Sequence, residues 1–191
     1  MDKATAKQAI RMAVVDAMET TDVPDITVMQ VCKASGVARS SFYRYYDSVD
    51  QVVKEMGNDL LASIRRINEL DARESRRGGS GVAIRQTDLA RAQVIEEYAP
   101  FIRAVNGIHG DPSFSAKAAV VLKESFEESN VVLLARVKNK ELLVEFFAAG
   151  VYNLINYWVK YHPEMTAEEF YGAIGEMFDS LIAVIEKSRK G

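Results

Sequence analysis

The residues best suited to chemistry in this sequence are hydrogen-bond donors gathered between Lys33 and Tyr46. The charged residues of this segment are all basic: Lys33, Arg39 and Arg44. The segment is therefore locally positive, although the whole chain has a formal net charge of −3. Helical spacing places four donors on one face, namely Arg39, Ser40, Tyr43 and Arg44. Guanidinium, hydroxyl and phenol groups can bind phosphates and base edges, so we favour contact with DNA over a merely solvated basic surface.

The element before these donors is predicted to be a short helix that begins after Thr27. The Thr27 hydroxyl can cap this helix, and Gln30, three residues further on, can complete a capping box. Helical spacing gives the helix one buried stripe, formed by Val28, Val31 and Cys32. Gly36 follows where a tight turn between helices requires positive φ, which a Cβ atom disfavours.

The donors themselves are predicted to lie on a second helix, at roughly residues 38–46. Phe42 and Tyr46, four residues apart, would point inward from it. Ser48 is expected to start the next, long helix and to form a second capping box with Gln51. Two short helices joined by a glycine turn form the helix-turn-helix frame that enters the DNA major groove.

With this arrangement, about the first fifty residues resemble the tetracycline-repressor (TetR) family of transcriptional regulators. The residues that carry the resemblance are Gly36-Val37, Ser41-Phe42-Tyr43, Tyr46 and Asp50-Gln51-Val52. Two positions depart from the family pattern: Ala38 lacks the usual capping hydroxyl, and Val49 stands where the family has a phosphate-contacting lysine. The resemblance implies an all-α protein, with a three-helix DNA-binding head at residues 1–47 and a helical effector-binding and dimerisation domain at residues 48–191.

The family pattern also implies roles for individual residues of the head. Thr27, Ser41 and Tyr43 would contact phosphate. Base edges or nearby phosphates would be contacted by Arg39, Ser40, Arg44 and Tyr45. Lys33 or Lys54 are the candidates to replace the missing lysine.

The composition restricts the class of protein. With 48% hydrophobic and 27% charged residues, the chain of 191 residues is typical of a soluble protein that buries a sizeable core. A net charge of −3 excludes a generally basic coat, so DNA contact must be confined to a local patch. The only cysteine, Cys32, allows no intramolecular disulfide. No apolar run follows a basic segment near the amino terminus, as it would in a signal peptide.

The most apolar stretch, Leu142–Val159, is interrupted by Glu145, Asn153 and Asn156. We therefore expect a buried helix rather than a membrane span, and a cytoplasmic protein that makes no membrane contact.

The body of the chain contains two clear breaks. Gly78-Gly79-Ser80-Gly81 follows an arginine-rich stretch and is predicted to be a flexible linker. Pro100 lies inside a helix expected from about Gln86, which predicts a kink or break near Tyr98. Asp111 should cap the next helix, with Pro112 at its first position.

Aromatic residues of the body are candidates to bind an effector between helices, together with a few polar groups. The predicted effector-binding residues are Tyr98, Phe101, Phe126, Phe147, Tyr152 and Asn153. For any single aromatic residue, ordinary core packing is the stronger interpretation. The alternative for Asn153 and its neighbour Asn156 is a hydrogen bond between helices at a dimer interface.

The last two helices are predicted to form that interface. The first, at about residues 141–161, is apolar almost all the way round and should be buried on more than one side. Thr166 and Glu169 form a capping box at the start of the second, whose apolar residues follow a spacing suited to a helix-bundle seam. The predicted interface residues are Tyr157, Trp158, Phe170, Ile174, Met177, Phe178 and Leu181. Two helices from each subunit would then make a four-helix interface.

No arrangement of residues indicates catalysis, a metal site or a cofactor. His109, His162 and Cys32 do not have metal-ligand spacing, and nucleotide-binding and nucleophile motifs are absent from the sequence. We expect a homodimeric TetR-like repressor that binds a palindromic operator and is released by a small, largely apolar effector. One alternative is an interaction module or coactivator of the same fold, controlled by a partner protein. Another is a small-molecule carrier that has lost DNA binding, which Ala38 and Val49 suggest.

Overall fold

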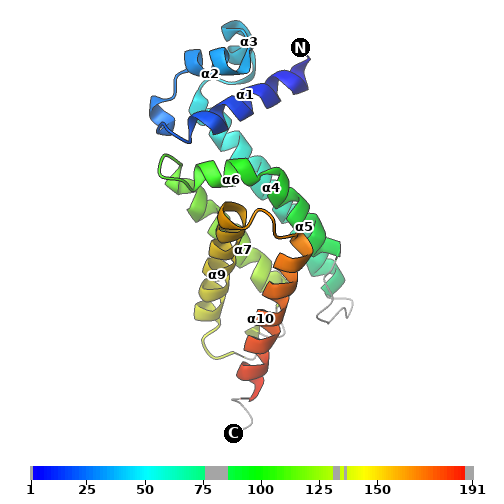
Figure 1. Ribbon diagram of the computed structural model, residues 1–191. Helices are drawn as coiled ribbons and strands as arrows, with labels where there is room; N and C mark the ends of the chain where they lie inside the picture. Colours follow the sequence, from blue (N-terminus) through cyan, green and yellow to red (C-terminus); the bar gives the residue numbers. More distant parts are fainter. Residues whose placement is uncertain (1, 76–85, 131–133, 136, 188–191) are drawn as a thin grey trace. The chain divides into compact units, whose positions relative to one another are not determined.

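The computed structural model describes residues 2–75, 86–130, 134–135 and 137–187 of the chain (Figure 1). The described residues form helices and turns without any β-strand, which confirms the all-α class. The predicted linker at residues 78–81 lies outside this described part.

Helices of the first part of the chain are α1 (Lys3–Ala17), the 3₁₀ turn η1 (Val23–Asp25), α2 (Val28–Ser35), α3 (Arg39–Tyr45) and α4 (Val49–Ser75). Those of the remainder are α5 (Gln86–Glu97), α6 (Ala99–Val105), α7 (Pro112–Ser129), α9 (Lys140–Tyr161) and α10 (Ala167–Lys187). The three predicted helices of the head are α1, α2 and α3.

Packing divides the chain into two compact units. Unit 1 comprises Met1–Ser63 and Tyr98–Val121, and unit 2 comprises Ile64–Glu97 and Leu122–Gly191. The predicted domain boundary between residues 47 and 48 falls inside unit 1, because the first turns of α4 and all of α6 belong to it. The two-domain division remains a prediction, since compact packing does not show which part folds alone. Both α4 and α7 continue from one unit into the other.

Capping residues set several helix ends as expected. At α2, the Thr27 hydroxyl accepts a hydrogen bond from the Gln30 N–H, while Gln30 Oε1 accepts one from the Thr27 N–H at 2.8 Å. The same reciprocal pair links Thr166 and Glu169 at α10. Both capping boxes are therefore confirmed.

The predicted capping box at the start of α4 forms only in part. The Ser48 hydroxyl accepts from the Gln51 N–H at 3.2 Å, but Gln51 Oε1 accepts from the N–H of Asp47 rather than from that of Ser48. The side chain of Gln51 thus reaches one residue further back and secures the turn that follows α3.

Both proline predictions for the body are confirmed. The helix that contains Pro100 breaks at Tyr98, which separates α5 from α6. The helix α7 begins at Pro112, and the Asp111 carboxylate accepts from the N–H of Ser113 at 2.9 Å. Proline fits the first turn of a helix, where an N–H group has no intrahelical partner.

The core of unit 1 is built around an aromatic residue of α3. Phe42 is fully buried, and its ring lies 6.0 Å from that of Tyr46. Of the residues predicted to point inward, Val31, Phe42 and Tyr46 are buried, whereas Val28 and Cys32 are half-buried. Ile10 and Val14 of α1 and Val37 of the turn are buried as well. The start of α4 completes this core with Val49, Val52 and Val53.

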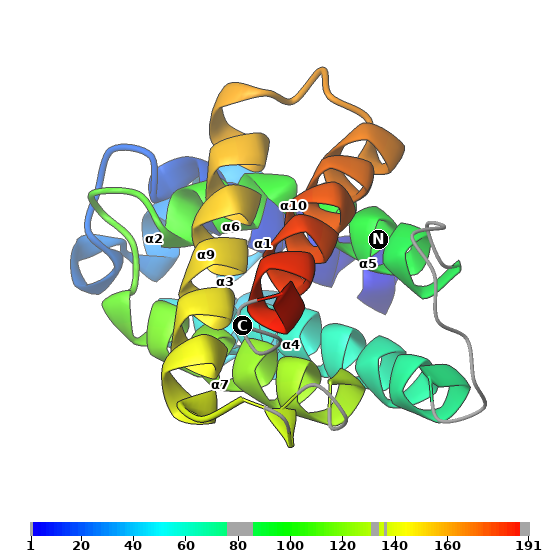
Figure 2. The same ribbon diagram turned by 90° about the horizontal axis from the view of Figure 1, so that it is seen from below.

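Unit 2 contains aromatic contacts and a buried charged group. The rings of Trp158 and Phe170 stack at 4.3 Å, linking α9 to α10, which run antiparallel in Figures 1 and 2.

Between α4 and α5, Arg91 donates to Asp71 at 2.7 Å, to Asp88 at 2.6 Å and to Asn68 at 2.9 Å. Because Asp71 is almost fully buried, this pairing fixes the end of α4 against the start of α5.

Within a single chain, α9 is buried on one side. The buried stripe is formed by Val144, Ala148, Trp158 and Val159. Large side chains elsewhere on it are exposed, namely Leu142, Phe146, Tyr157 and Tyr161. By length and composition alone, α9 could also cross a membrane, but core helices of soluble proteins pass the same test. A second buried face would require contacts beyond this single chain.

Gly36 has a φ of 67°, in the left-handed region expected for the turn between α2 and α3. An added Cβ would meet no atom within 4 Å, so substitution is opposed by the backbone conformation alone. We expect Gly36→Ala to lower the free energy of unfolding by about 1 kcal/mol. Chemical denaturation measures this change.

The matched variant is Gly36→Asn, since asparagine adopts the left-handed conformation more readily than alanine. It should therefore lose less stability than Gly36→Ala. Equal losses in both variants would show that something other than backbone conformation determines the cost at this turn.

Candidate nucleic-acid interface

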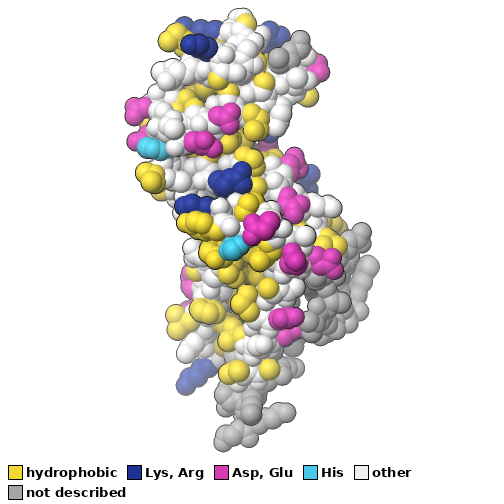
Figure 3. Space-filling view, in the orientation of Figure 1, with side chains coloured by type: hydrophobic (Ala, Val, Ile, Leu, Met, Phe, Trp, Pro, Cys, Tyr) yellow, Lys and Arg dark blue, Asp and Glu magenta, His cyan; other side chains and the backbone are white. Residues whose placement is uncertain are grey.

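The outward face of α3 carries the predicted donors. Arg39, Ser40, Tyr43 and Arg44 are exposed, with 46% exposure at Tyr43, while Phe42 on the opposite side is buried. Figure 3 shows Lys and Arg side chains at the end of unit 1 that carries α2 and α3. The sequence pattern therefore predicted correctly which residues of α3 point away from the core.

Neighbouring donors on this face are already in contact with one another. The Arg39 guanidinium lies 5.6 Å from the centre of the Tyr43 ring, and that of Arg44 lies 5.7 Å from the Tyr45 ring. Arg44 also donates to the Ser41 hydroxyl at 3.2 Å. Cation–π contacts of this kind restrict the guanidinium groups without neutralising their charge. Both remain suited to bind an anion.

Two further predicted residues lie at the two ends of α2. Thr27 is exposed at the amino terminus of α2, where unpaired N–H groups and the helix dipole favour a phosphate. Its hydroxyl donates to Gln30 Oε1 at 2.7 Å, so it also serves the capping box. Lys33 is exposed in the last turn of α2.

Cys32 precedes Lys33 on α2. Burial raises the pKa of its thiol, which keeps the thiol protonated at neutral pH.

An ion-pair cluster behind the face joins α1 to α4. Lys7 donates to Glu55 at 2.8 Å, and Arg11 donates to the same carboxylate oxygen at 2.6 Å and to Asp59 at 2.5 Å. The hydroxyl of Tyr46, the residue that ends α3, also donates to Glu55, at 2.8 Å. We call these five residues the α1–α4 cluster.

The α1–α4 cluster is balanced in charge, with two basic and two acidic side chains. Burial alone would raise the pKa of Glu55, but hydrogen bonds from Lys7, Arg11 and Tyr46 lower it to about 2. Glu55 is therefore ionised at neutral pH and neutralises cations of α1. The positive charge next to α3 is left to Lys33, Arg39 and Arg44.

This cluster was not predicted from the sequence. Lys7 and Arg11 are four residues apart on α1, and Glu55 and Asp59 are four apart on α4. Matching i,i+4 pairs of opposite charge on two neighbouring helices were the signal that could have identified it.

The position that carries a lysine in the family pattern is not available for DNA contact here. Val49 is only 4% exposed, because it packs into the core at the start of α4. Of the two predicted replacements, Lys54 is paired with Asp50 at 2.7 Å, whereas Lys33 is exposed in the last turn of α2, the helix that precedes the donors. Lys33 is therefore the better placed of the two.

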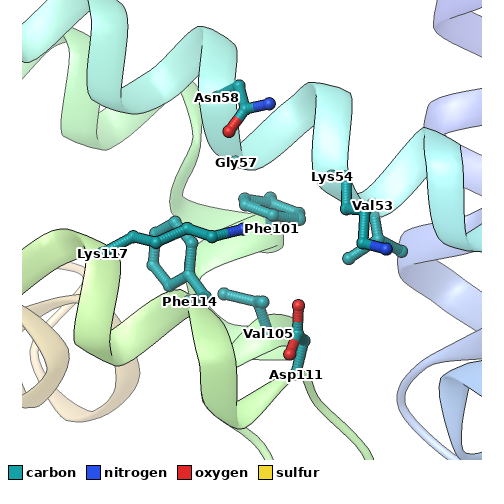
Figure 4. A pocket seen from close by; sticks show the side chains of 9 residues that line it. All are labelled: Val53, Lys54, Gly57, Asn58, Phe101, Val105, Asp111, Phe114 and Lys117. Carbon is teal, nitrogen blue, oxygen red and sulfur yellow. The ribbon is translucent and has the colours of Figure 1, made fainter.

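Of the predicted effector-binding residues, two belong to unit 1. Phe101 is buried against Phe114 with the rings edge to face at 5.7 Å, and Tyr98 lies at the break before α6. Figure 4 shows Phe101 and Phe114 at a cleft between α4, α6 and α7, which Lys54 and Lys117 also line. The cavity volume is about 10 Å³, enough for one water molecule.

The other four belong to unit 2, and the two phenylalanines among them are in direct ring contact. Phe126 and Phe147 stack at 4.3 Å, and Phe178 packs edge to face against both. Tyr152 is half-buried, and Asn153 is exposed. The Asn153 side chain donates to a carbonyl of its own helix, that of Ala149, at 2.8 Å. The structure thus brings together Phe126, Phe147 and Phe178, but it does not place Asn153 beside them.

The predicted interface residues separate into three groups by burial. Trp158 and Phe170 are buried against each other inside the chain, and Phe178 packs against Phe126 and Phe147. Ile174 and Leu181 are half-buried. Tyr157 and Met177 are exposed. Only this last pair leaves most of its surface for another molecule.

No group of three or more His, Cys, Asp or Glu side chains is arranged to hold a metal ion in the described part of the chain. His109 pairs with Asp22 at 2.5 Å, and His162 contacts Glu164 at 3.0 Å and the Tyr157 hydroxyl at 2.9 Å. The two histidines thus have carboxylate partners in different units.

Residues 90–180 match a TetR-related family described as "Transcriptional regulator C-terminal region". A comparison with curated protein sequences finds no match. Among solved structures, a putative TetR-family transcriptional regulator from Syntrophomonas wolfei is 14% identical with a TM-score of 0.63, over 95% of this chain and 97% of that one.

Two other solved structures are similar over most of their length. The "Dihydroxyacetone kinase operon activator DhaS" has a TM-score of 0.60 at 13% identity, over 94% of this chain and 97% of that one. The TetR family transcriptional regulator PfmR from Thermus thermophilus has a TM-score of 0.58 at 16% identity, over 91% of this chain and 92% of that one. At such identities the likeness shows a shared fold.

Because Glu55 is ionised in the folded protein, we expect the free energy of unfolding to fall in acid. In the unfolded chain Glu55 titrates near its ordinary pKa of 4.5, whereas its pKa in the folded protein is about 2. The contribution of Glu55 to the free energy of unfolding is therefore complete above the unfolded pKa and is lost as the pH falls through the folded pKa. We expect stability to decline between about pH 5 and about pH 2, measured by chemical denaturation at a series of pH values.

Glu55→Gln provides the control, because glutamine does not titrate. This variant should be less stable than the wild type at pH 7 and should lose less further stability on acidification. A decline as steep as that of the wild type would assign the effect to other carboxylates.

Proposed function

The chain is a TetR-family transcriptional regulator, and we propose that it is a repressor that binds palindromic operator DNA as a homodimer and is released by a small, largely apolar effector. The observation that carries this proposal is the outward face of α3, where exposed donors have no acidic neighbour between Lys33 and Tyr46. A protein with a net charge of −3 would otherwise repel DNA.

Contacts with DNA would divide into two kinds. Thr27, Ser41 and Tyr43 would bind phosphate and fix the position of α3 on the duplex, whereas Arg39, Ser40, Arg44 and Tyr45 would reach base edges or adjacent phosphates. Two copies of α3 must lie about 34 to 36 Å apart to enter successive major grooves. A two-fold symmetric dimer therefore requires a palindromic operator.

The exposed apolar side chains of α9 and α10 support the dimer. On α9 the stripe Leu142, Phe146, Tyr157 and Tyr161 is exposed, and α10 adds Met177 and Val184. Large exposed apolar side chains of this kind are favoured against another protein surface rather than water. A second copy would offer the same stripe, giving four helices packed around a two-fold axis. Trp158, Phe170 and Phe178 would support this surface from within each subunit.

Release would require the effector to bind two states of the protein with different affinities. The cleft beside Phe101 has room for only about one water molecule, so an effector would have to open it; because α4 lines the cleft at Val53 and Gly57, opening it would act on α4. Val53 is also part of the core beneath α3, so a ligand that widened the cleft would displace that core. The cluster of Phe126, Phe147 and Phe178 in unit 2 is the other apolar site available to an effector. Loss of DNA binding would then relieve repression.

A partner protein is the alternative controlling ligand. The exposed stripe on α9 would suit a partner as well as a second copy, and the neighbour of the same fold with "operon activator" in its name is compatible with positive control. The oligomeric state of the purified protein distinguishes these possibilities.

The family and fold are those of regulators rather than enzymes, which supports a DNA-binding protein of the cytoplasm.

We expect Arg44→Ala and Tyr43→Ala each to weaken binding to an operator obtained by in vitro selection. The loss should be about 1–3 kcal/mol for a residue that reads a base edge, and smaller for one that binds phosphate alone. Both side chains are exposed, so the fold should be retained. Fluorescence anisotropy with labelled operator measures the change.

Arg73→Ala is the matched control, because Arg73 is an exposed arginine of α4 that belongs to unit 2. It removes the same charge and should leave operator affinity unchanged. Unchanged affinity in both the Arg44 and the Tyr43 variants would reject α3 as the recognition helix.

We expect Phe146→Asp to convert the dimer into a monomer. Phe146 is 66% exposed in the single chain, so the charge should disturb the subunit interface rather than the subunit core. Size-exclusion chromatography with light scattering measures the mass. Val120→Asp is the control, since Val120 is also exposed but lies on α7 in unit 1. A dimer that persists in Phe146→Asp would exclude this face of α9 as the interface.

A further inference from the structure

The short recognition helix α3 is held very differently at its two ends. At its start, Ala38 makes no side-chain hydrogen bond to cap the helix. At its end, Tyr46 is 1% exposed, and its N–H donates to the carbonyl of Phe42 at 3.0 Å. A helix of seven residues has little stability of its own, so its orientation depends on such tertiary contacts.

The hydroxyl of Tyr46 makes two hydrogen bonds of opposite direction. It accepts from Arg11 Nε of α1 at 3.2 Å and donates to Glu55 Oε1 of α4 at 2.8 Å. Arg11 closes the triangle by donating to that same Glu55 oxygen at 2.6 Å. A hydroxyl bound as both acceptor and donor has a fixed direction, which fixes the end of the Tyr46 side chain.

The ring of Tyr46 is held as well. It lies 6.0 Å from the ring of Phe42, and the Lys7 ammonium lies 4.9 Å from its centre. Burial and the acceptor Glu55 raise the pKa of the Tyr46 hydroxyl, so that it stays protonated and able to donate. One side chain therefore ties the end of α3 to both α1 and α4.

We infer that the Tyr46 hydroxyl is a positioning group for DNA recognition, which sets the orientation of the last turn of α3 through Arg11 and Glu55. Arg44 and Tyr45 immediately precede Tyr46, so a rotation of this turn would redirect both. Base-edge hydrogen bonds require accurate direction, whereas phosphate contacts tolerate displacement. Loss of the hydroxyl should therefore lower specificity for the operator more than affinity for DNA in general.

The inference rests on the proposed DNA-binding function, so its test includes one measurement without DNA. Tyr46→Phe removes the hydroxyl and keeps the buried ring. In the free protein, amide hydrogen exchange should become faster in α3, while exchange in α2 stays unchanged, because α2 has its own capping box. With DNA, the ratio of operator affinity to non-operator affinity should fall roughly tenfold, with little change in non-operator affinity.

Val15→Ala is the matched control for general destabilisation. Val15 is a buried residue of α1 outside the α1–α4 cluster, so its truncation should lower the melting temperature without changing the affinity ratio. Glu55→Gln, which leaves a weaker acceptor for the same hydroxyl, should change the ratio in the same direction as Tyr46→Phe. Combining the two substitutions should give less than the sum of their separate effects, since both act on one hydrogen bond.

Three outcomes would overturn the inference. The first is α3 exchange in Tyr46→Phe as slow as in the wild type. The second is an affinity ratio unchanged by Tyr46→Phe, and the third is an equal fall in Val15→Ala. If the wild type binds no operator, the proposed function fails, and the exchange rates of α3 still decide whether the Tyr46 hydroxyl orients this helix.

Discussion

The structure of unit 1 depends on the pairing of Lys7 and Arg11 with Glu55 and Asp59 between α1 and α4. Charged groups at a partly buried contact are stabilising only when each has partners of opposite charge and suitable geometry. Here three donors meet one oxygen of Glu55, which lowers the pKa of its carboxyl group to about 2. This pairing fixes α4 against α1, and through Tyr46 it also fixes the end of α3. The two carboxylates also neutralise the charges of Lys7 and Arg11, so that the unpaired positive charge near the proposed DNA-binding face belongs to residues of α2 and α3.

The second constraint is the surplus of apolar surface on α9. One stripe of α9 packs into the core of its own chain, while Leu142, Phe146, Tyr157 and Tyr161 remain exposed. An isolated subunit would thus keep a long apolar surface in water, which favours association. The match of residues 90–180 to the C-terminal region of transcriptional regulators includes this helix. At 13–16% identity, the likeness to the solved structures is a likeness of fold.

Local features were predictable from the sequence because they depend on neighbouring residues. The capping boxes at Thr27 and Thr166, the left-handed turn at Gly36 and the break before Pro100 all formed as predicted. The inward and outward faces of α3 followed from helical spacing. Pairings across the chain were not predictable in this way. Trp158 and Phe170, both predicted at the dimer interface, stack on each other inside the chain, and Val49 packs into the core at the start of α4.

The sequence by itself determined the all-α class, the helix-turn-helix frame and the donor face of α3, since turn residues, caps and a 3.6-residue period encode them locally. Only the tertiary structure decided which donors of Lys7, Arg11 and Tyr46 meet at Glu55, and which apolar residues of α9 are left exposed. Both outcomes depend on how helices distant in sequence pack against each other, which periodicity along one helix does not specify. The physical reason is that the apolar residues along one helix predict which of its faces is buried. Which other helix covers that face depends on the shape and charge of both surfaces in the folded protein.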